Sequence, residues 1–176
     1  AVNPDFLGPG RLLDHSRDFD PLRDRGPNVP RNSLTILNTA LYKSVFFYDG
    51  RVFVQSTTDG SSNIRTPDSG ITLDPLAGDS LLEAQARFPV ASPDEMRNFF
   101  HPELGSGESF RQLLVGRLRG EVDTDKLSVS GPDRWLQRFR LAFNNPNATR
   151  ESLITYPNIQ KAIAAYQQSM TFVDTP

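Results

Sequence analysis

The chain has 176 residues, 37% of them hydrophobic and 23% charged, and this length predicts about one domain. Its 19 basic and 21 acidic residues give a net charge of -2, without the concentrated positive charge of a nucleic-acid-binding protein. There is no cysteine and no apolar run near the roughly 20 residues of a membrane helix, so disulfides, thiolate metal sites and a membrane span are excluded within these residues.

The first half of the chain is predicted to be largely irregular. Residues 1–32 carry five prolines and three glycines, which favours an extended arm. Residues 33–54 are expected to form a short helix, from leucines at helical spacing, and then a strand or buried corner over residues 45–48 that ends at the Asp49-Gly50 turn. Residues 55–79 lack apolar periodicity and are interpreted as an inserted, structureless loop.

The second half, residues 80–176, is predicted to be helical. Capping-box patterns and apolar residues at helical spacing indicate its helices. They are expected over residues 81–87, from Ser92 onward, over 109–119 with an end at Gly120, over 131–143 and over 157–170. On the last helix the aligned apolar side chains are those of Ile159, Ile163, Tyr166 and Met170. The predicted fold class is therefore all-α, with long irregular loops and little strand.

Common catalytic and phosphate-binding signatures are absent. The sequence contains no H-E-x-x-H, G-x-S-x-G, Walker loop or complete G-x-G-x-x-G. Its two histidines, His15 and His101, are isolated, and a lone histidine is more often structural than a ligand. Composition and pattern alone leave the function open.

Three segments of the sequence, taken together, carry a resemblance. Residues 31–41 and 46–52 are similar to the pattern R-N-x-P-T-x-x-N-x-A…F-W-D-G-R. Residues 82–96 are similar to L-x-E-Q-A…N-P-x-E-M, and residues 159–169 to I-x-x-A-I-A-A-F-E-R-T. These patterns belong to the bacterial di-haem cytochrome c peroxidases, a family that includes the MauG-type enzymes. The segments occur in the family's order and cover residues 31–174.

The resemblance implies an oxidoreductase with a cytochrome-c-like helical fold. It would reduce hydrogen peroxide, or oxidise a protein substrate as MauG-type enzymes do, with electrons from a small redox protein such as a cytochrome c or a cupredoxin. In this family the region lies between two haem-attachment motifs. Because both C-x-x-C-H motifs are absent here, we expect the chain to be a fragment of a periplasmic protein whose two haems c are attached elsewhere. The alternative is a haemless scaffold or interaction subunit, and a homodimer stays open.

The resemblance also implies roles for individual residues. Glu95 would move a proton between the peroxide oxygens, and Gln85 would help to orient the peroxide; the alternative for Glu95 is a capping box with Ser92. Tyr48 stands where the family has a tryptophan and would relay electrons, or would only pack as an aromatic ring. Asn32 would contribute to a calcium site, and His15 is a candidate distal ligand of the haem.

Overall fold

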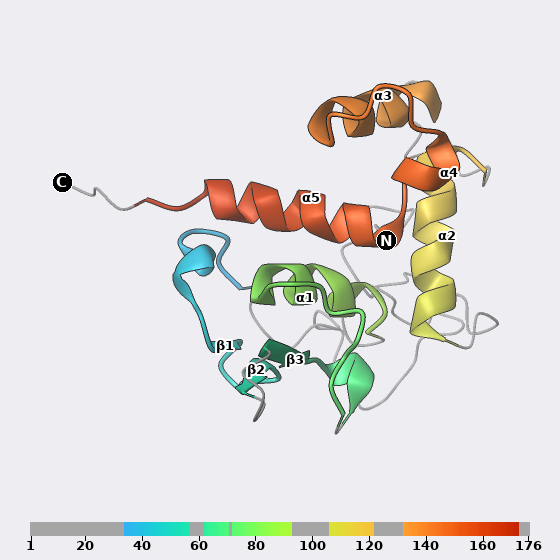
Figure 1. Ribbon diagram of the computed structural model, residues 1–176. Helices are drawn as coiled ribbons and strands as arrows, with labels where there is room; N and C mark the ends of the chain where they lie inside the picture. The colour runs from blue at the N-terminus through green and yellow to red at the C-terminus, as the bar shows by residue number, and fades with distance from the viewer. Residues whose placement is uncertain (1–33, 57–61, 71, 93–105, 122–131, 173–176) are drawn as a thin grey trace, which may run out of the picture.

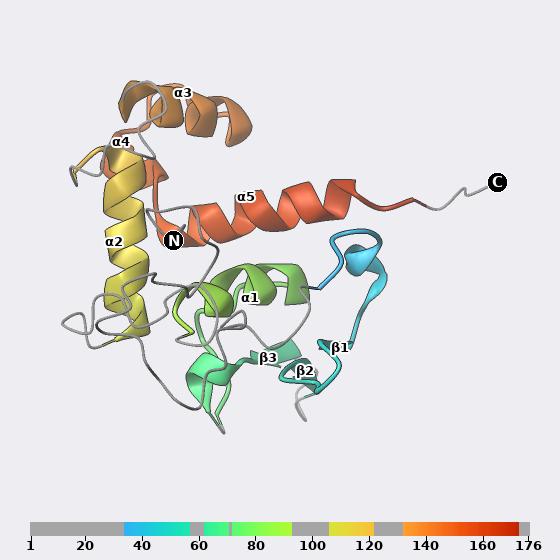
Figure 2. The same cartoon turned by 180° about the vertical axis from the view of Figure 1, so that it is seen from behind.

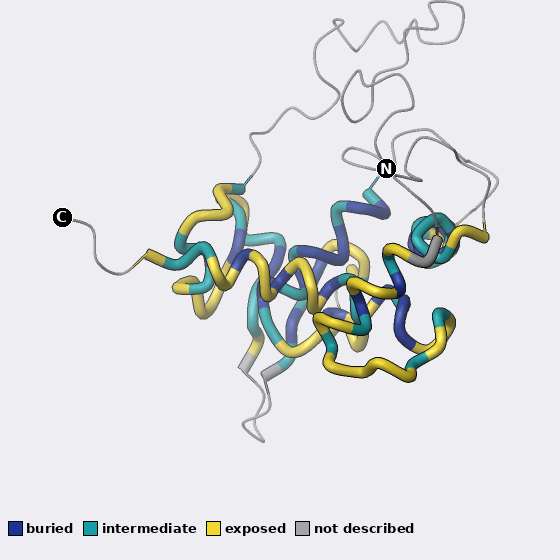
Figure 3. Tube along the Cα trace, turned by 90° about the horizontal axis from the view of Figure 1, so that it is seen from above, coloured by how far each residue is buried: buried dark blue, intermediate teal, exposed yellow. Residues whose placement is uncertain are grey.

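The computed structural model describes residues 34–56, 62–70, 72–92, 106–121 and 132–172. Within this part of the chain, a small sheet lies on one side of helix α1 (Leu81–Arg87) and helix α5 (Tyr156–Ser169) lies on the other (Figures 1 and 2). Buried positions concentrate in these central segments and exposed positions at the periphery (Figure 3). No described helix is long and apolar enough to cross a membrane.

The sheet shows that the all-α prediction is wrong. Strands β1 (Val45–Phe46), β2 (Val52–Ser56) and β3 (Ser62–Arg65) pair antiparallel in the order β1-β2-β3. Of the two interpretations of residues 45–48, a strand or a buried corner, the structure shows a short strand at Val45–Phe46. The loop expected over residues 55–79 contains the end of β2, all of β3 and a short 3-10 helix.

Strand β3 was not predicted because it is short and only half-buried. Only Ile64 of this strand is a large apolar residue, and it pairs with Val54 in the neighbouring strand. Its side chain is 6% exposed and packs in a core cluster with Phe46 and Val52. Because side chains alternate between the two faces of a sheet, a four-residue strand needs only one or two apolar positions. That is too few for a pattern in the sequence.

Helix α1 forms the centre of the core and is confirmed as predicted. Ser80 caps it, since its hydroxyl accepts a hydrogen bond from the backbone N–H of Glu83 at 3.2 Å. Its apolar side chains are buried on more than one side, between the sheet and α5. They are those of Leu81, Leu82, Ala84 and Ala86.

Helix α5 forms as predicted, but a different face of it is buried. Ile163 and Tyr166 are 39% and 56% exposed, whereas Gln160, Ala164 and Gln167 are buried. The amide of Gln160 donates hydrogen bonds to backbone carbonyls, among them that of Leu76 at 3.2 Å. Glutamines that find such partners can be buried in place of apolar side chains, so periodicity alone selected the wrong stripe.

The other helices lie at the end of α5 that carries Tyr156 (Figure 1). Helix α2 (Gly107–Arg119) ends as predicted at Gly120, which has a φ of 75°. Helix α3 (Pro132–Ala142) is also confirmed, and the short helix α4 (Arg150–Leu153) was not predicted.

The helix expected from residue 33 is reduced to one 3-10 turn over Thr39–Leu41. Asn38 interrupts it with a left-handed backbone, at a φ of 60°. Its backbone N–H donates to the carbonyl of Met170 at 3.1 Å, and its side-chain oxygen accepts from the backbone N–H of Phe172 at 2.7 Å. Asn38 thus binds the end of α5, and asparagine tolerates this backbone better than most residues do.

Replacing Asn38 with alanine is expected to lower the free energy of unfolding by about 1–3 kcal/mol. The change removes the hydrogen bond to Phe172 and puts alanine in a left-handed conformation. Equilibrium unfolding in urea measures the loss. Asn38→Gly is the matched control, because glycine removes the same bond but accepts the backbone, so it should destabilise less than alanine. An equal loss for both variants would show that the backbone conformation contributes nothing.

Candidate functional site

The three segments that carry the resemblance meet in space at α5. Gln85 of α1 is half-buried, and its side-chain oxygen accepts a hydrogen bond from Nε2 of Gln167 at 2.9 Å. Asn38 binds the residues that follow the same helix. One residue from each of the first two segments therefore contacts α5, which contains the third segment, or the residues that follow it, although these residues lie 82 and 134 positions apart from their partners.

Among the other predicted site residues, only Tyr48 lies within the described part of the chain, and it does not contact Gln85. Tyr48 lies in the turn between β1 and β2, and at 110% relative exposure its side chain does not pack against the described part of the chain. Glu95, Asn32 and His15 lie outside the described residues, as does the helix expected after Ser92. Their predicted roles stay predictions.

The turn that presents Tyr48 is held by its neighbours. Gly50 donates a backbone hydrogen bond to the carbonyl of Phe47 at 3.1 Å. The ring of Phe47 packs edge-on against Phe88 with centroids 5.4 Å apart, and the guanidinium of Arg51 lies 4.3 Å from the centroid of Phe47. The exposed tyrosine therefore sits on a turn that is anchored to the end of α1.

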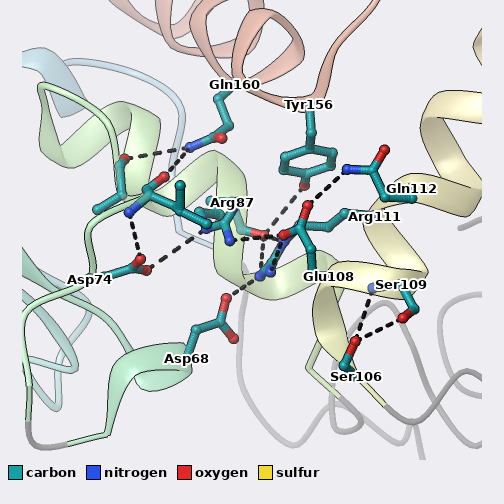
Figure 4. A network of polar contacts seen from close by, with 12 residues as sticks. Asp68, Asp74, Arg87, Ser106, Glu108, Ser109, Arg111, Gln112, Tyr156 and Gln160 are labelled. Atoms are coloured by element: carbon teal, nitrogen blue, oxygen red, sulfur yellow. Dashed lines mark hydrogen bonds and ion pairs between the residues drawn. The ribbon is translucent and has the colours of Figure 1, made fainter.

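Beyond Gln85, the same helix ends in a buried ionic cluster, which we call the arginine network (Figure 4). Side chains from α1, α2, α5 and the 3-10 helix Pro67–Ser69 point toward one another there. Its members are Asp68, Asp74, Arg87, Glu108, Arg111 and Tyr156.

The two arginines of the network are almost fully buried. Nη2 of Arg87 lies 3.1 Å from a carboxylate oxygen of Glu108, and its Nε lies 3.9 Å from Asp74. Arg111 pairs with Asp68 and with Glu108. A buried guanidinium is tolerated only where carboxylates or other acceptors compensate for its lost hydration.

The network also caps the helix that carries Gln85. The backbone carbonyl of Arg87 accepts hydrogen bonds from Nε of Arg111 at 3.3 Å and from the hydroxyl of Tyr156 at 3.4 Å. The last carbonyls of a helix have no partner within it, so these donors fix the end of α1. Sequence reasoning missed the network; the one signal available was the position of Arg111 beside the buried Phe110.

The network changes the acidity of two of its members. Burial raises the pKa of Tyr156 to about 12, against the opposing charge of Arg111 and Arg87. For Glu108, partial burial acts to raise the pKa. Hydrogen bonds from Gln112 and Arg87, together with the charges of the two arginines, outweigh it and hold the pKa below its usual range.

Alkaline pH is expected to destabilise the protein through Tyr156. Above pH 10 the side chain ionises in the unfolded chain but stays neutral in the folded one until about pH 12. Stability should therefore fall by about 1.4 kcal/mol per pH unit in this window, or about 2–3 kcal/mol in all. Urea unfolding of the protein and of Tyr156→Phe at pH 9 and pH 11 checks this. An equally steep fall in the phenylalanine variant would assign the effect to other groups.

The residues present do not fit a covalently attached haem c. Thioether attachment needs cysteines, and the chain has none. Both histidines lie outside the described residues, and the described part contains no group of three or more His, Cys, Asp or Glu side chains that could hold a metal ion. What the described site offers is a polar amide, that of Gln85, at the point where the three segments meet.

Comparison with known proteins identifies the class. The family model of the di-haem cytochrome c peroxidases matches residues 14–176. The chain therefore belongs to the di-haem cytochrome c peroxidase family, which confirms the resemblance and places it among the haem-dependent peroxidases and related oxidoreductases. No match was found among curated proteins or among solved structures.

Proposed function

We propose that this chain is the part of a periplasmic di-haem c-type peroxidase that supplies Gln85 and Glu95 to the peroxide site, with both haems attached by residues outside the printed sequence. The observation that carries the proposal is the family match over residues 14–176. The meeting of the three family segments at α5 supports it, because Gln85 is the predicted site residue at that meeting point.

The reaction is the reduction of hydrogen peroxide by two electrons and two protons to two water molecules. Haem, when bound, supplies the electron transfer. The ionised carboxylate of Glu95 would take the proton from one peroxide oxygen and return it to the other, which leaves as water when the O–O bond breaks. The amide of Gln85 would hold the peroxide by a hydrogen bond, so that the proton moves over a short distance.

The remaining roles belong to the same proposal. A small redox protein, a cytochrome c or a cupredoxin, would donate the electrons. Tyr48 would relay them, and its ring is exposed. Asn32 would bind calcium and His15 would be a distal ligand of the haem. A protein side chain, oxidised as by MauG-type enzymes, is the second class of substrate.

The proposal can be tested on the complete native protein, by its haem content and its peroxide-dependent activity. Haem bound by thioethers stays on the polypeptide in a denaturing gel, so a haem stain and the visible spectrum should show two haems per chain. Reduced cytochrome c or a reduced cupredoxin should then be oxidised only when hydrogen peroxide is added. A colourless native protein, without haem, would overturn the proposal and favour the haemless scaffold.

A further inference from the structure

The residue before Tyr48 has an unfavourable backbone conformation. Phe47 has a φ of 65°, in the left-handed region that bulky residues rarely adopt. In the described part of the chain the other non-glycine residues with a positive φ are Asn38 and Asn144, and asparagine tolerates this conformation. The strained position of the described chain therefore lies directly beside its exposed tyrosine.

The left-handed backbone reverses the direction of the next side chain. Side chains of an extended strand alternate between its two faces. In β1, Val45 is exposed and Phe46 is buried in the core, so continued alternation would turn Phe47 outward and Tyr48 into the core. Instead, Phe47 packs against the same core cluster as Phe46, and Tyr48 is fully exposed.

Contacts of Phe47 and its neighbours hold this conformation. Its ring packs edge-on against Phe88, the guanidinium of Arg51 lies over the ring, and its carbonyl accepts a hydrogen bond from the backbone N–H of Gly50. At the base of the turn, Phe46 pairs with Val52 across the sheet. None of these contacts involves the ring of Tyr48, so they fix the turn with that ring outside.

Stability alone does not explain the arrangement. A tyrosine ring left in water forgoes the favourable burial of a large side chain, and the left-handed backbone of Phe47 adds a cost of its own. Strain of this kind is often found at binding and active sites. A rigid aromatic ring on a fixed turn suits contact with another molecule, because it offers a large contact area and loses little side-chain freedom.

We infer that Phe47 is a positioning residue: its left-handed backbone keeps Tyr48 at the surface, where the small redox protein that donates electrons can contact the ring. The identity of this partner rests on the proposed function. The direction in which Tyr48 points does not, since it follows from the backbone of Phe47. Phe47 acts on the partner only through Tyr48.

Nitration by tetranitromethane, read out by mass spectrometry of the complete protein, measures whether Tyr48 is at the surface. The described part of the chain offers three reference tyrosines: Tyr42 and Tyr166 are about half-exposed, and Tyr156 is buried. Of these four side chains, Tyr48 should be nitrated fastest and Tyr156 slowest. A rate for Tyr48 as low as that of Tyr156 would overturn the inference.

Two variants separate the backbone of Phe47 from its ring. Phe47→Asn and Phe47→Val both remove the ring, but asparagine tolerates a left-handed backbone and β-branched valine does not. Phe47→Val should lower the nitration rate of Tyr48 by about tenfold, because the left-handed penalty reduces the population of the outward turn by about that factor. Phe47→Asn should lower it much less. Equal rates in the two variants would show that the backbone of residue 47 does not direct Tyr48.

Tyr156 reports whether a variant is still folded. Faster nitration of Tyr156 in Phe47→Val would mean that the variant has unfolded. The milder pair Phe47→Gly and Phe47→Ala then makes the same comparison, because glycine accepts the left-handed backbone and alanine does not. Tyr48 should be nitrated more slowly in the alanine variant, and an equal rate in this pair would overturn the inference.

Oxidation of the reduced electron donor by the complete protein tests the purpose of the exposed ring. Phe47→Val should lower kcat/KM for the donor as much as Tyr48→Leu does, and Phe47→Asn should lower it less. The double variant Phe47→Val/Tyr48→Leu should lose no more than Tyr48→Leu, because the group that Phe47 acts through is gone. Tyr166→Leu, at a half-exposed tyrosine of α5, is the matched control and should leave kcat/KM unchanged.

The outcomes distinguish this inference from the function on which it rests. Full activity of Tyr48→Leu, or of a Phe47→Val variant whose Tyr48 is nitrated slowly, would overturn the contact with the donor while peroxide-dependent turnover stands. A complete protein without haem or turnover would instead refute the proposed function. The nitration rates would then still decide whether Phe47 directs Tyr48.

Discussion

Replacing Glu95 with glutamine in the complete protein is expected to lower kcat/KM for hydrogen peroxide by about 10²–10⁴-fold, the usual contribution of a positioned acid or base. Glutamine has nearly the shape of glutamate but cannot take up and return a proton at neutral pH. The limb of the pH–rate profile that reports ionisation of a carboxyl group should disappear with the activity. Steady-state oxidation of the reduced electron donor measures both effects.

This substitution also separates catalysis from helix capping. In a capping box, glutamate or glutamine at the third helical position serves equally well, so Glu95→Gln should leave the unfolding midpoint unchanged. Ser92→Ala is the complementary variant: if the capping box forms, this change removes the cap and should destabilise by about 1 kcal/mol without abolishing turnover. Full activity of Glu95→Gln would rule out the proton-transfer role and leave the capping interpretation of Ser92 and Glu95.

Local chemistry explains which elements the sequence could predict. Ser80 before a helical run and Gly120 after one are signals that act within a few residues, through a side-chain cap and a left-handed backbone. Helices α1 and α2 begin and end close to where these signals indicate. The family motifs correctly indicated the class, since the match to the family spans residues 14–176.

Contacts between elements explain the errors. Ile64 becomes part of a strand because β2 pairs with it, and Asn38 is left-handed where it binds the end of α5. The buried face of α5 is decided by backbone carbonyls that receive the amide of Gln160. The partners of Asn38 and Gln160 are far from them in sequence, and the strand of Ile64 is too short to leave a pattern, so apolar spacing alone could not predict these contacts.

The candidate site, like the fold, could be predicted only where a local motif indicates it. Gln85 was indicated by its motif, and the structure places it against α5; its role at the peroxide stays a prediction. Its partner Gln167 was missed, because periodicity assigned the apolar stripe of α5 to the interior. The arginine network was missed because each charged residue reads as a surface residue until its distant partner is known.

Replacing Arg87 with methionine is expected to lower the free energy of unfolding by about 3–5 kcal/mol, the usual effect of removing one partner from a buried ion pair. The side chains of Arg87 and Asp74 are each 6% exposed. Without the guanidinium, the Asp74 carboxylate keeps hydrogen bonds from the hydroxyl of Thr66 and the backbone N–H of Leu76. It loses the positive charge that compensates for its burial, and the neighbouring Glu108 loses the donor at 3.1 Å.

The double variant Arg87→Met/Asp74→Leu shows whether the buried charge is the cause. Replacing a whole buried pair with apolar side chains is often close to neutral, so the double variant should recover much of the stability lost by Arg87→Met. Arg134→Met, at an exposed position of α3, is the control for loss of an arginine and should change stability by less than about 0.5 kcal/mol. Equilibrium unfolding in urea gives all three values. If the double variant were less stable than Arg87→Met, the packing of Asp74 and not its unpaired charge would explain the loss.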